Sequence, residues 1–171
     1  EFRQHRQHRA VQVLFVDDGS TDGSREILSE LSATEPEVGA VFLRRNFGKG
    51  AALMAGFRHA TGDAVVTMDA DLQDDPAEIP ARLATLEAGA DLVSGWKADR
   101  HDPWTTRAAS KVFNGVTARV AGIKLHDLNC GLKAYRAEVL EGLNLYGELH
   151  RYIPVLAHYR GYRVTELPVN H

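Results

Sequence analysis

The chain has 171 residues, 44% of them hydrophobic and 25% charged, with a formal net charge of -3. These values are typical of one globular domain with a core of its own; they exclude wholesale disorder and do not suggest a nucleic-acid partner. The single cysteine, Cys130, excludes an internal disulfide, and no apolar run approaches the roughly 18 residues of a membrane span.

Charge is distributed unevenly along the chain. Residues 61–91 hold eight acidic residues and one basic residue, Arg82, a balance of -7. Residues 97–136 hold eight basic and three acidic residues, a balance of +5. An acidic segment suits a bound cation, and a basic segment suits an anionic ligand or a membrane surface, although solvated charged faces would give the same counts.

The hydrophobic pattern predicts alternating strands and helices. In chain order it predicts strand 11–16, helix 25–33, strand 38–45, helix 48–60, strand 62–69, helix 75–89, strand 90–96 and helix 103–122, then a loop over 126–143 leading into a short helix, helix 148–161 and strand 162–170. Such alternation builds right-handed βαβ units. We therefore expect one α/β domain over residues 1–171, with a mostly parallel sheet flanked by helices.

Acidic residues follow two of the predicted strands. Asp17 and Asp18 come after the first strand, and Asp69 and Asp71 come after the third. In a parallel sheet, ligands bind at the carboxyl ends of the strands. Asp75 has a structural alternative, because Asp-Pro at 75–76 is a typical helix start with Asp75 as its N-cap.

The Asp69-x-Asp71 pair is a candidate metal site. Carboxylate oxygens are hard ligands, and Mg²⁺ or Mn²⁺ often combines one or two of them with water and substrate phosphates. An ion held there can neutralise a nucleotide diphosphate and stabilise it as a leaving group. The pair is a weak signal alone and a stronger one directly after the strand VVTM.

Five segments in this order resemble the family 2 glycosyltransferases, and most of all those of the dolichol-phosphate mannose synthase type. They are VDDGSTDGS, NFGKGAALMAGF, GDAVVTMDADLQDDP, LVSGWK and HDLNCGLKAYR. The resemblance extends over nearly all of residues 11–170. It implies a GT-A fold, a nucleotide-sugar donor and transfer with inversion.

The resemblance also implies roles at the donor. It assigns Asp18, with Asp17 beside it, to the base or ribose, and Asp69 and Asp71 to the diphosphate and metal, with Gln73 as a further metal ligand. Lys97 stands where the family often has arginine, on the diphosphate side; lysine keeps the charge but loses the planar fork. Lys49, in a glycine-rich turn, is a weaker candidate for a donor contact.

At the acceptor, Asp127 matches the family's acidic position and is the expected catalytic residue, and the resemblance implies that Lys133 and Arg136 hold an acceptor phosphate. A hydroxyl acceptor needs a general base, whereas a lipid phosphate, with a second pKa of roughly 6, needs little deprotonation. Asp127 would then orient the phosphate or take a residual proton while the basic residues do the electrostatic work.

We therefore expect transfer of a hexose from a UDP- or GDP-sugar to a polyprenyl phosphate. One alternative is a transferase acting on a saccharide or glycolipid hydroxyl, and another is a non-catalytic nucleotide-binding remnant. The family's usual first strand, with a Pro-x-Tyr-Asn-Glu-like motif, has no counterpart before residue 11, so we expect a fragment of a longer chain. The basic helix with Arg107, Lys111 and Arg119 predicts a peripheral site at the cytoplasmic face of a membrane.

Three further residues favour structural roles on the sequence. Cys130 lacks a readable histidine-based triad and is expected to be a packed thiol. His126, next to Asp127, is expected to make a local hydrogen bond rather than act in catalysis, and Trp96 is expected to pack.

Overall fold

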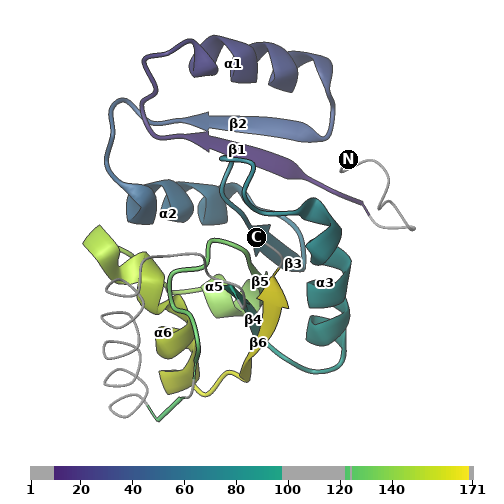
Figure 1. The fold of residues 1–171 in the computed structure, drawn as a ribbon. Helices are drawn as coiled ribbons and strands as arrows, with labels where there is room; N and C mark the ends of the chain where they lie inside the picture. Colours follow the sequence, from purple (N-terminus) through teal and green to yellow (C-terminus); the bar gives the residue numbers. More distant parts are fainter. Residues whose placement is uncertain (1–9, 98–121, 124, 170–171) are drawn as a thin grey trace.

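The computed structural model describes residues 10–97, 122–123 and 125–169, and the strands in this part form two hydrogen-bonded groups (Figure 1). β1 (Val13–Asp17) and β2 (Val38–Phe42) pair in parallel. The second group has the order β3 (Ala64–Thr67), β5 (Lys133–Arg136), β4 (Leu92–Lys97), β6 (Val164–Val169). β5 is antiparallel to both neighbours and β4 is parallel to β6, so three of these four strands run in one direction. The predicted mostly parallel arrangement of strands is confirmed, but the strands form a two-stranded and a four-stranded sheet.

Helices cover both groups of strands (Figure 1). The β1–β2 pair lies between α1 (Ser24–Thr34) and α2 (Lys49–His59). The four-stranded sheet lies between α3 (Ile79–Glu87) and α6 (Ile153–Tyr159). Three short segments complete the fold: η2 (Pro76–Glu78), α5 (Ala137–Leu140) and η3 (Gly147–Tyr152).

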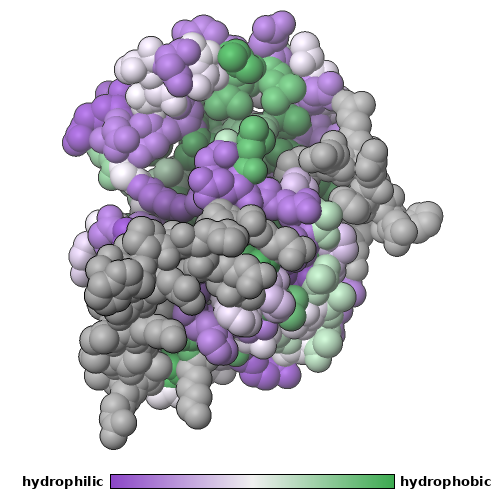
Figure 2. Space-filling view, in the orientation of Figure 1, coloured by the Kyte–Doolittle hydropathy of each residue, from purple (hydrophilic) through white to green (hydrophobic). Residues whose placement is uncertain are grey.

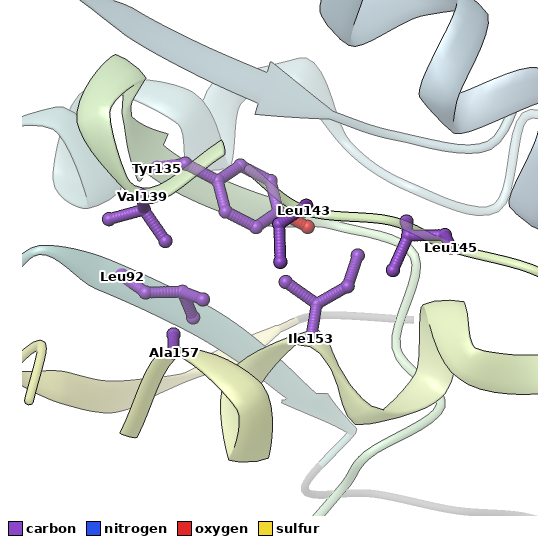
Figure 3. Close-up of a cluster of buried hydrophobic side chains, with 7 residues drawn as sticks. All are labelled: Leu92, Tyr135, Val139, Leu143, Leu145, Ile153 and Ala157. Carbon is purple, nitrogen blue, oxygen red and sulfur yellow. The ribbon is translucent and has the colours of Figure 1, made fainter. Parts of the chain in front are cut away.

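Neighbouring residues of β4 face the two sides of the sheet. Leu92 packs toward α6 in a cluster with Tyr135 and Ile153 (Figure 3), whereas Val93 packs with Leu86 of α3. Both β4 side chains are fully buried. A strand that is apolar on both faces needs cover on both, which explains the continuous rather than alternating hydrophobic pattern.

The structure agrees with most of the predicted elements and corrects one. The predicted strands and the helices at 25–33, 48–60, 75–89 and 148–161 all have counterparts, and Asp75 caps η2 by accepting a hydrogen bond from the Ala77 amide at 2.9 Å. Over 126–143 the predicted loop leading into a short helix matches α5 in its helical part but missed β5. Helix 103–122 lies almost entirely outside the described residues. Within the described part, no helix has the length and apolar character needed to cross a bilayer.

Candidate functional site

The turn after β1 holds both of its aspartates in hydrogen bonds. Asp17 is 4% exposed and accepts hydrogen bonds from the Ser20 amide at 2.9 Å and from Arg25 Nε at 3.4 Å. The hydrogen bonds from Ser20, with help from Arg25, lower the pKa of the Asp17 carboxyl despite its burial. Asp17 therefore stabilises the turn as an anion, and its carboxylate is not open to a ligand.

Asp18 joins this turn to the segment before α2. Its two oxygens accept hydrogen bonds from the amides of Phe47 and Gly48, both at 2.8 Å. Gly19 makes the approach possible: its φ is +79°, and a Cβ there would lie 2.4 Å from the Arg45 carbonyl carbon. In this structure the Asp17 and Asp18 carboxylates make hydrogen bonds that shape the loops, and their expected contact with the donor stays a prediction.

Lys49 and Asp69 form an ion pair at the carboxyl end of β3. The Lys49 ammonium donates to both Asp69 oxygens, at 2.6 and 2.8 Å, and each side chain is 40% exposed. Gly131 leaves room for the carboxylate, because a Cβ at that position would lie 2.5 Å from Asp69 Oδ2. The sequence signals for Lys49 and Asp69 thus converge on one place, 20 residues apart in the chain.

The loop after Asp69 has a strained, exposed tip. Asp71 Oδ1 accepts a hydrogen bond from the Gln73 amide at 3.1 Å, and the Asp69 amide donates to Asp74 Oδ2 at 3.2 Å. Leu72, between Asp71 and Gln73, is 97% exposed and has a φ of +65°, which is rare for a bulky side chain. Such strain is found mostly at functional sites.

The Asp69 and Asp71 side chains fit the expected divalent ion in chemistry. Both offer hard oxygen ligands, and Asp69 already accepts one cation, the Lys49 ammonium, which an ion would have to displace. Among the described residues, no three His, Cys, Asp or Glu side chains gather closely enough to hold an ion on their own. Such an ion would therefore need oxygen atoms from a substrate or from water.

Lys133 brings a second positive charge to the same edge. It is 5% exposed, and its ammonium donates to the Cys130 carbonyl. Burial lowers the pKa of Lys133, while the Asp127 and Asp69 carboxylates counteract this by favouring the charged form. Cys130 is a packed thiol as expected: it is 1% exposed, and burial raises its pKa.

Asp127 lies in a loop that is tied down on both sides. The residue is 3% exposed, and its Oδ1 accepts a hydrogen bond from the Asn129 amide at 2.9 Å. Its own amide donates to Glu166 of β6 at 3.2 Å. His126 also hydrogen-bonds to Glu166, 40 residues away in the chain, so its partner is not the local one that was expected. Its ring stacks on Trp96.

Glu166 was not among the functional residues predicted from the sequence. The only signal in the sequence was a glutamate inside a predicted strand. In the structure its side chain is 8% exposed, and a charged side chain that is so little exposed needs hydrogen-bond partners. Those partners lie 39 and 40 residues away in the chain, so the sequence pattern alone does not identify them.

Arg136 is not brought to this edge. Lys133 lies opposite Thr67 at the carboxyl end of β3, whereas Arg136 lies opposite Ala64 at its amino end. There Arg136 donates to the carbonyls of Leu86 and Ala90 and forms an ion pair with Asp91. Lys97 ends β4, opposite Val169, and its side chain lies outside the described set.

The hydrophilic residues gather where the strands end. Figure 2 shows them on the side where β1 and β2 end and in a band across the middle of the same face. At this edge Lys49 pairs with Asp69, and Lys133 begins β5 opposite Thr67, the last residue of β3. The Lys49 and Asp69 side chains are each 40% exposed and open to a ligand, whereas Lys133 and Asp127 are buried.

Comparison with a family model gives one match that spans most of the chain. Residues 2–143 match the model described as glycosyl transferase family 2. A relative from Edwardsiella ictaluri (strain 93-146), undecaprenyl-phosphate 4-deoxy-4-formamido-L-arabinose transferase, is 43% identical over 165 residues. That match covers 95% of this chain and 50% of the relative, so the chain spans about half the length of this relative.

Solved structures share the fold. Glucosyl-3-phosphoglycerate synthase from Mycobacterium tuberculosis, in complex with phosphoglyceric acid, matches with a TM-score of 0.69 and 22% identity, over 92% of this chain and 59% of that one. A mannosyltransferase from Pyrobaculum calidifontis, in complex with GDP-Man and Mn²⁺, matches with a TM-score of 0.64 and 25% identity, over 92% and 45%. The likeness to these two structures confirms the expected GT-A fold.

Proposed function

The chain belongs to glycosyl transferase family 2, and we propose that residues 1–171 form a catalytic domain that transfers a sugar, with inversion, from a UDP- or GDP-sugar to a polyprenyl phosphate. The observation that carries the proposal is the exposed Lys49–Asp69 ion pair at the carboxyl end of β3, where Lys133 begins β5 opposite Thr67. The 43% identical relative, whose name specifies an undecaprenyl phosphate, supports the acceptor class.

The proposed donor class is broader than the hexose expected from the sequence, because it includes pentoses. The relative's name specifies a derivative of arabinose, which is a pentose. The mannosyltransferase of similar fold carries GDP-Man, a hexose donor. A test of donors therefore has to include both sugar classes and both bases.

In the proposed reaction, a phosphate oxygen of the acceptor forms a bond to the anomeric carbon, the bond to the donor's diphosphate breaks, and the nucleoside diphosphate leaves. Asp69 and Asp71, with Gln73 as the expected third ligand, would hold Mg²⁺ or Mn²⁺, and such an ion supplies charge neutralisation to the diphosphate. Lys49, next to Asp69 and 40% exposed, is the cation best situated to contact the diphosphate.

On the acceptor side, Lys133 and Asp127 have different roles in the proposed reaction. The buried Lys133 ammonium offsets the negative charge that accumulates when an acceptor phosphate approaches a donor diphosphate. Asp127 orients the acceptor or takes its residual proton. We propose further that the protein works at the cytoplasmic face of a membrane, where its acceptor is held.

The test is a transfer assay on the full-length protein with UDP- and GDP-linked hexoses and pentoses, undecaprenyl phosphate, and saccharide acceptors, read by mass spectrometry. We expect a sugar-phosphate-lipid product and, with this acceptor, a loss of less than about 100-fold in Asp127→Asn, because general-base catalysis contributes about 10²- to 10⁴-fold. Glu30→Gln, an exposed change on α1, is the matched control.

Other outcomes decide between the alternatives. Transfer only to hydroxyl acceptors, abolished in Asp127→Asn, would replace the proposed acceptor class. Binding of UDP or GDP by calorimetry with no transfer to any acceptor would identify a non-catalytic remnant.

A further inference from the structure

Glu166 is a buried carboxylate turned toward the loop that carries Asp127. It lies on β6 opposite Ser94 of β4, and its side chain is 8% exposed. Its oxygens accept hydrogen bonds from the His126 amide at 2.8 and 3.0 Å and from the Asp127 amide at 3.2 Å. One side chain of the sheet therefore holds two successive amides of the loop.

The His126 side chain strengthens this attachment. Its Nδ1 lies 2.9 Å from Glu166 Oε2, and because a carboxylate only accepts, Nδ1 carries the proton. The ring also stacks on Trp96, with centroids 4.6 Å apart and planes inclined by 26°. Trp96 lies two residues after Ser94 on β4, so Trp96 and Glu166 face the same side of the sheet.

Asp127 is thereby held at both of its ends. Glu166 fixes its amide, and the Asn129 amide holds Oδ1 at 2.9 Å. Hydrogen bonds to a charged acceptor are short and about twice as strong as neutral ones, and a buried carboxylate that lost these donors would be destabilised. The position of the Asp127 carboxylate thus depends on a residue that itself lies outside the site.

We propose that Glu166 is a positioning residue for the transfer reaction: it aligns the Asp127 carboxylate by anchoring the backbone of residues 126 and 127 to β6. This inference rests on the proposed function, because it assigns Asp127 a part in the reaction. Glu166 touches neither substrate in this scheme. Glu166 therefore affects the rate of the chemical step, because a displacement of a catalytic group by about 1 Å can lower that rate by up to about 100-fold.

The first experiment uses Glu166→Gln in the full-length protein, with Glu30→Gln as control. The amide has the shape of the carboxylate but presents one acceptor oxygen in place of two. We expect kcat to fall by about tenfold, and by no more than in Asp127→Asn, while the KM for the nucleotide sugar changes by less than about threefold. The double variant Asp127→Asn/Glu166→Gln should be no slower than Asp127→Asn alone, because a residue acting through Asp127 has nothing left to align.

A wild-type kcat in Glu166→Gln, or an effect that adds in full to that of Asp127→Asn, overturns the proposal. A lowered melting temperature with unchanged kcat also overturns it, since Glu166 would then serve folding alone. Amide hydrogen exchange at residues 126 and 127 gives a readout independent of turnover: faster exchange in Glu166→Gln supports the anchoring, and unchanged exchange refutes it. Absence of transfer by the wild type, by contrast, refutes the proposed function while the exchange result still decides the anchoring.

Discussion

Replacing Lys49 with glutamine tests whether this lysine competes with a divalent ion for Asp69. The Lys49 ammonium binds both oxygens of Asp69, at 2.6 and 2.8 Å, on the carboxylate expected to be a metal ligand. A Mn²⁺ ion that binds Asp69 without nucleotide has to break this ion pair first. Lys49→Gln removes the competing charge and keeps most of the side chain's length.

The exposure of the pair sets the size of the effect. Because both side chains are 40% exposed, water screens the pair, and ion pairs of this kind contribute about 0.2–1 kcal/mol. Since 1.4 kcal/mol corresponds to a factor of ten, Lys49→Gln should bind Mn²⁺ about 1.4- to fivefold more tightly than the wild type. The difference should shrink as the salt concentration rises, because salt screens exposed charges.

Free Mn²⁺ can be titrated by electron paramagnetic resonance without nucleotide, which separates ion binding from turnover. Arg58→Gln, at the last turn of the same helix, removes an equal charge away from Asp69 and should leave the affinity unchanged. Asp69→Asn should abolish the binding. Equal or weaker Mn²⁺ affinity in Lys49→Gln would show that the ion pair and the ion do not compete, and the metal assignment of Asp69 would lose its support.

Three further changes test the turn, the site and the core. The pKa of Asp17 is lowered in the folded state, so its carboxylate stabilises the fold at pH values above the ordinary pKa of 3.8, and this contribution is lost as the pH falls through the lower pKa of the folded state. Asp17→Asn should therefore remove this loss of stability at acid pH, measured by urea titrations at several pH values. An unchanged pH dependence of stability in this variant would contradict the reasoning. Gly131→Ala should weaken Mn²⁺ binding with little change in melting temperature, because its Cβ would displace the flexible Asp69 carboxylate, 2.5 Å away; unaltered binding would exclude Asp69 as a ligand in this position. Leu92→Ala, at a side chain with no exposure, should lower the free energy of unfolding by about 2–5 kcal/mol in denaturant titrations, whereas exposed Ile27→Ala should cost far less.

Local patterns predicted the elements well, because their causes are local. The β-branched runs at 11–16 and 62–69 became β1 and β3, and Asp75 with Pro76 starts η2 as a cap and a first-turn proline. These assignments depend on the conformational preferences of a few adjacent residues, which any single sequence displays.

The course of β5 was the main feature that the sequence did not reveal. Four residues, Lys133–Arg136, form a strand too short to show a period, and its direction depends on β3 and β4 on either side. That direction separates Lys133 from Arg136: one lies at the carboxyl end of β3 and the other at its amino end. From the sequence alone Lys133 and Arg136 were expected at one site, because they are only three positions apart.

By itself the sequence determined the α/β class, the family resemblance and the kinds of residue available at the strand ends. The tertiary structure decided which of those residues face one another: Asp18 toward the amides of Phe47 and Gly48, Lys49 toward Asp69, and Glu166 toward the amide of Asp127. The reason is physical. Helix and strand preferences act over neighbouring residues, whereas ion pairs and buried hydrogen bonds form between groups that only strand pairing and packing bring within about 3 Å.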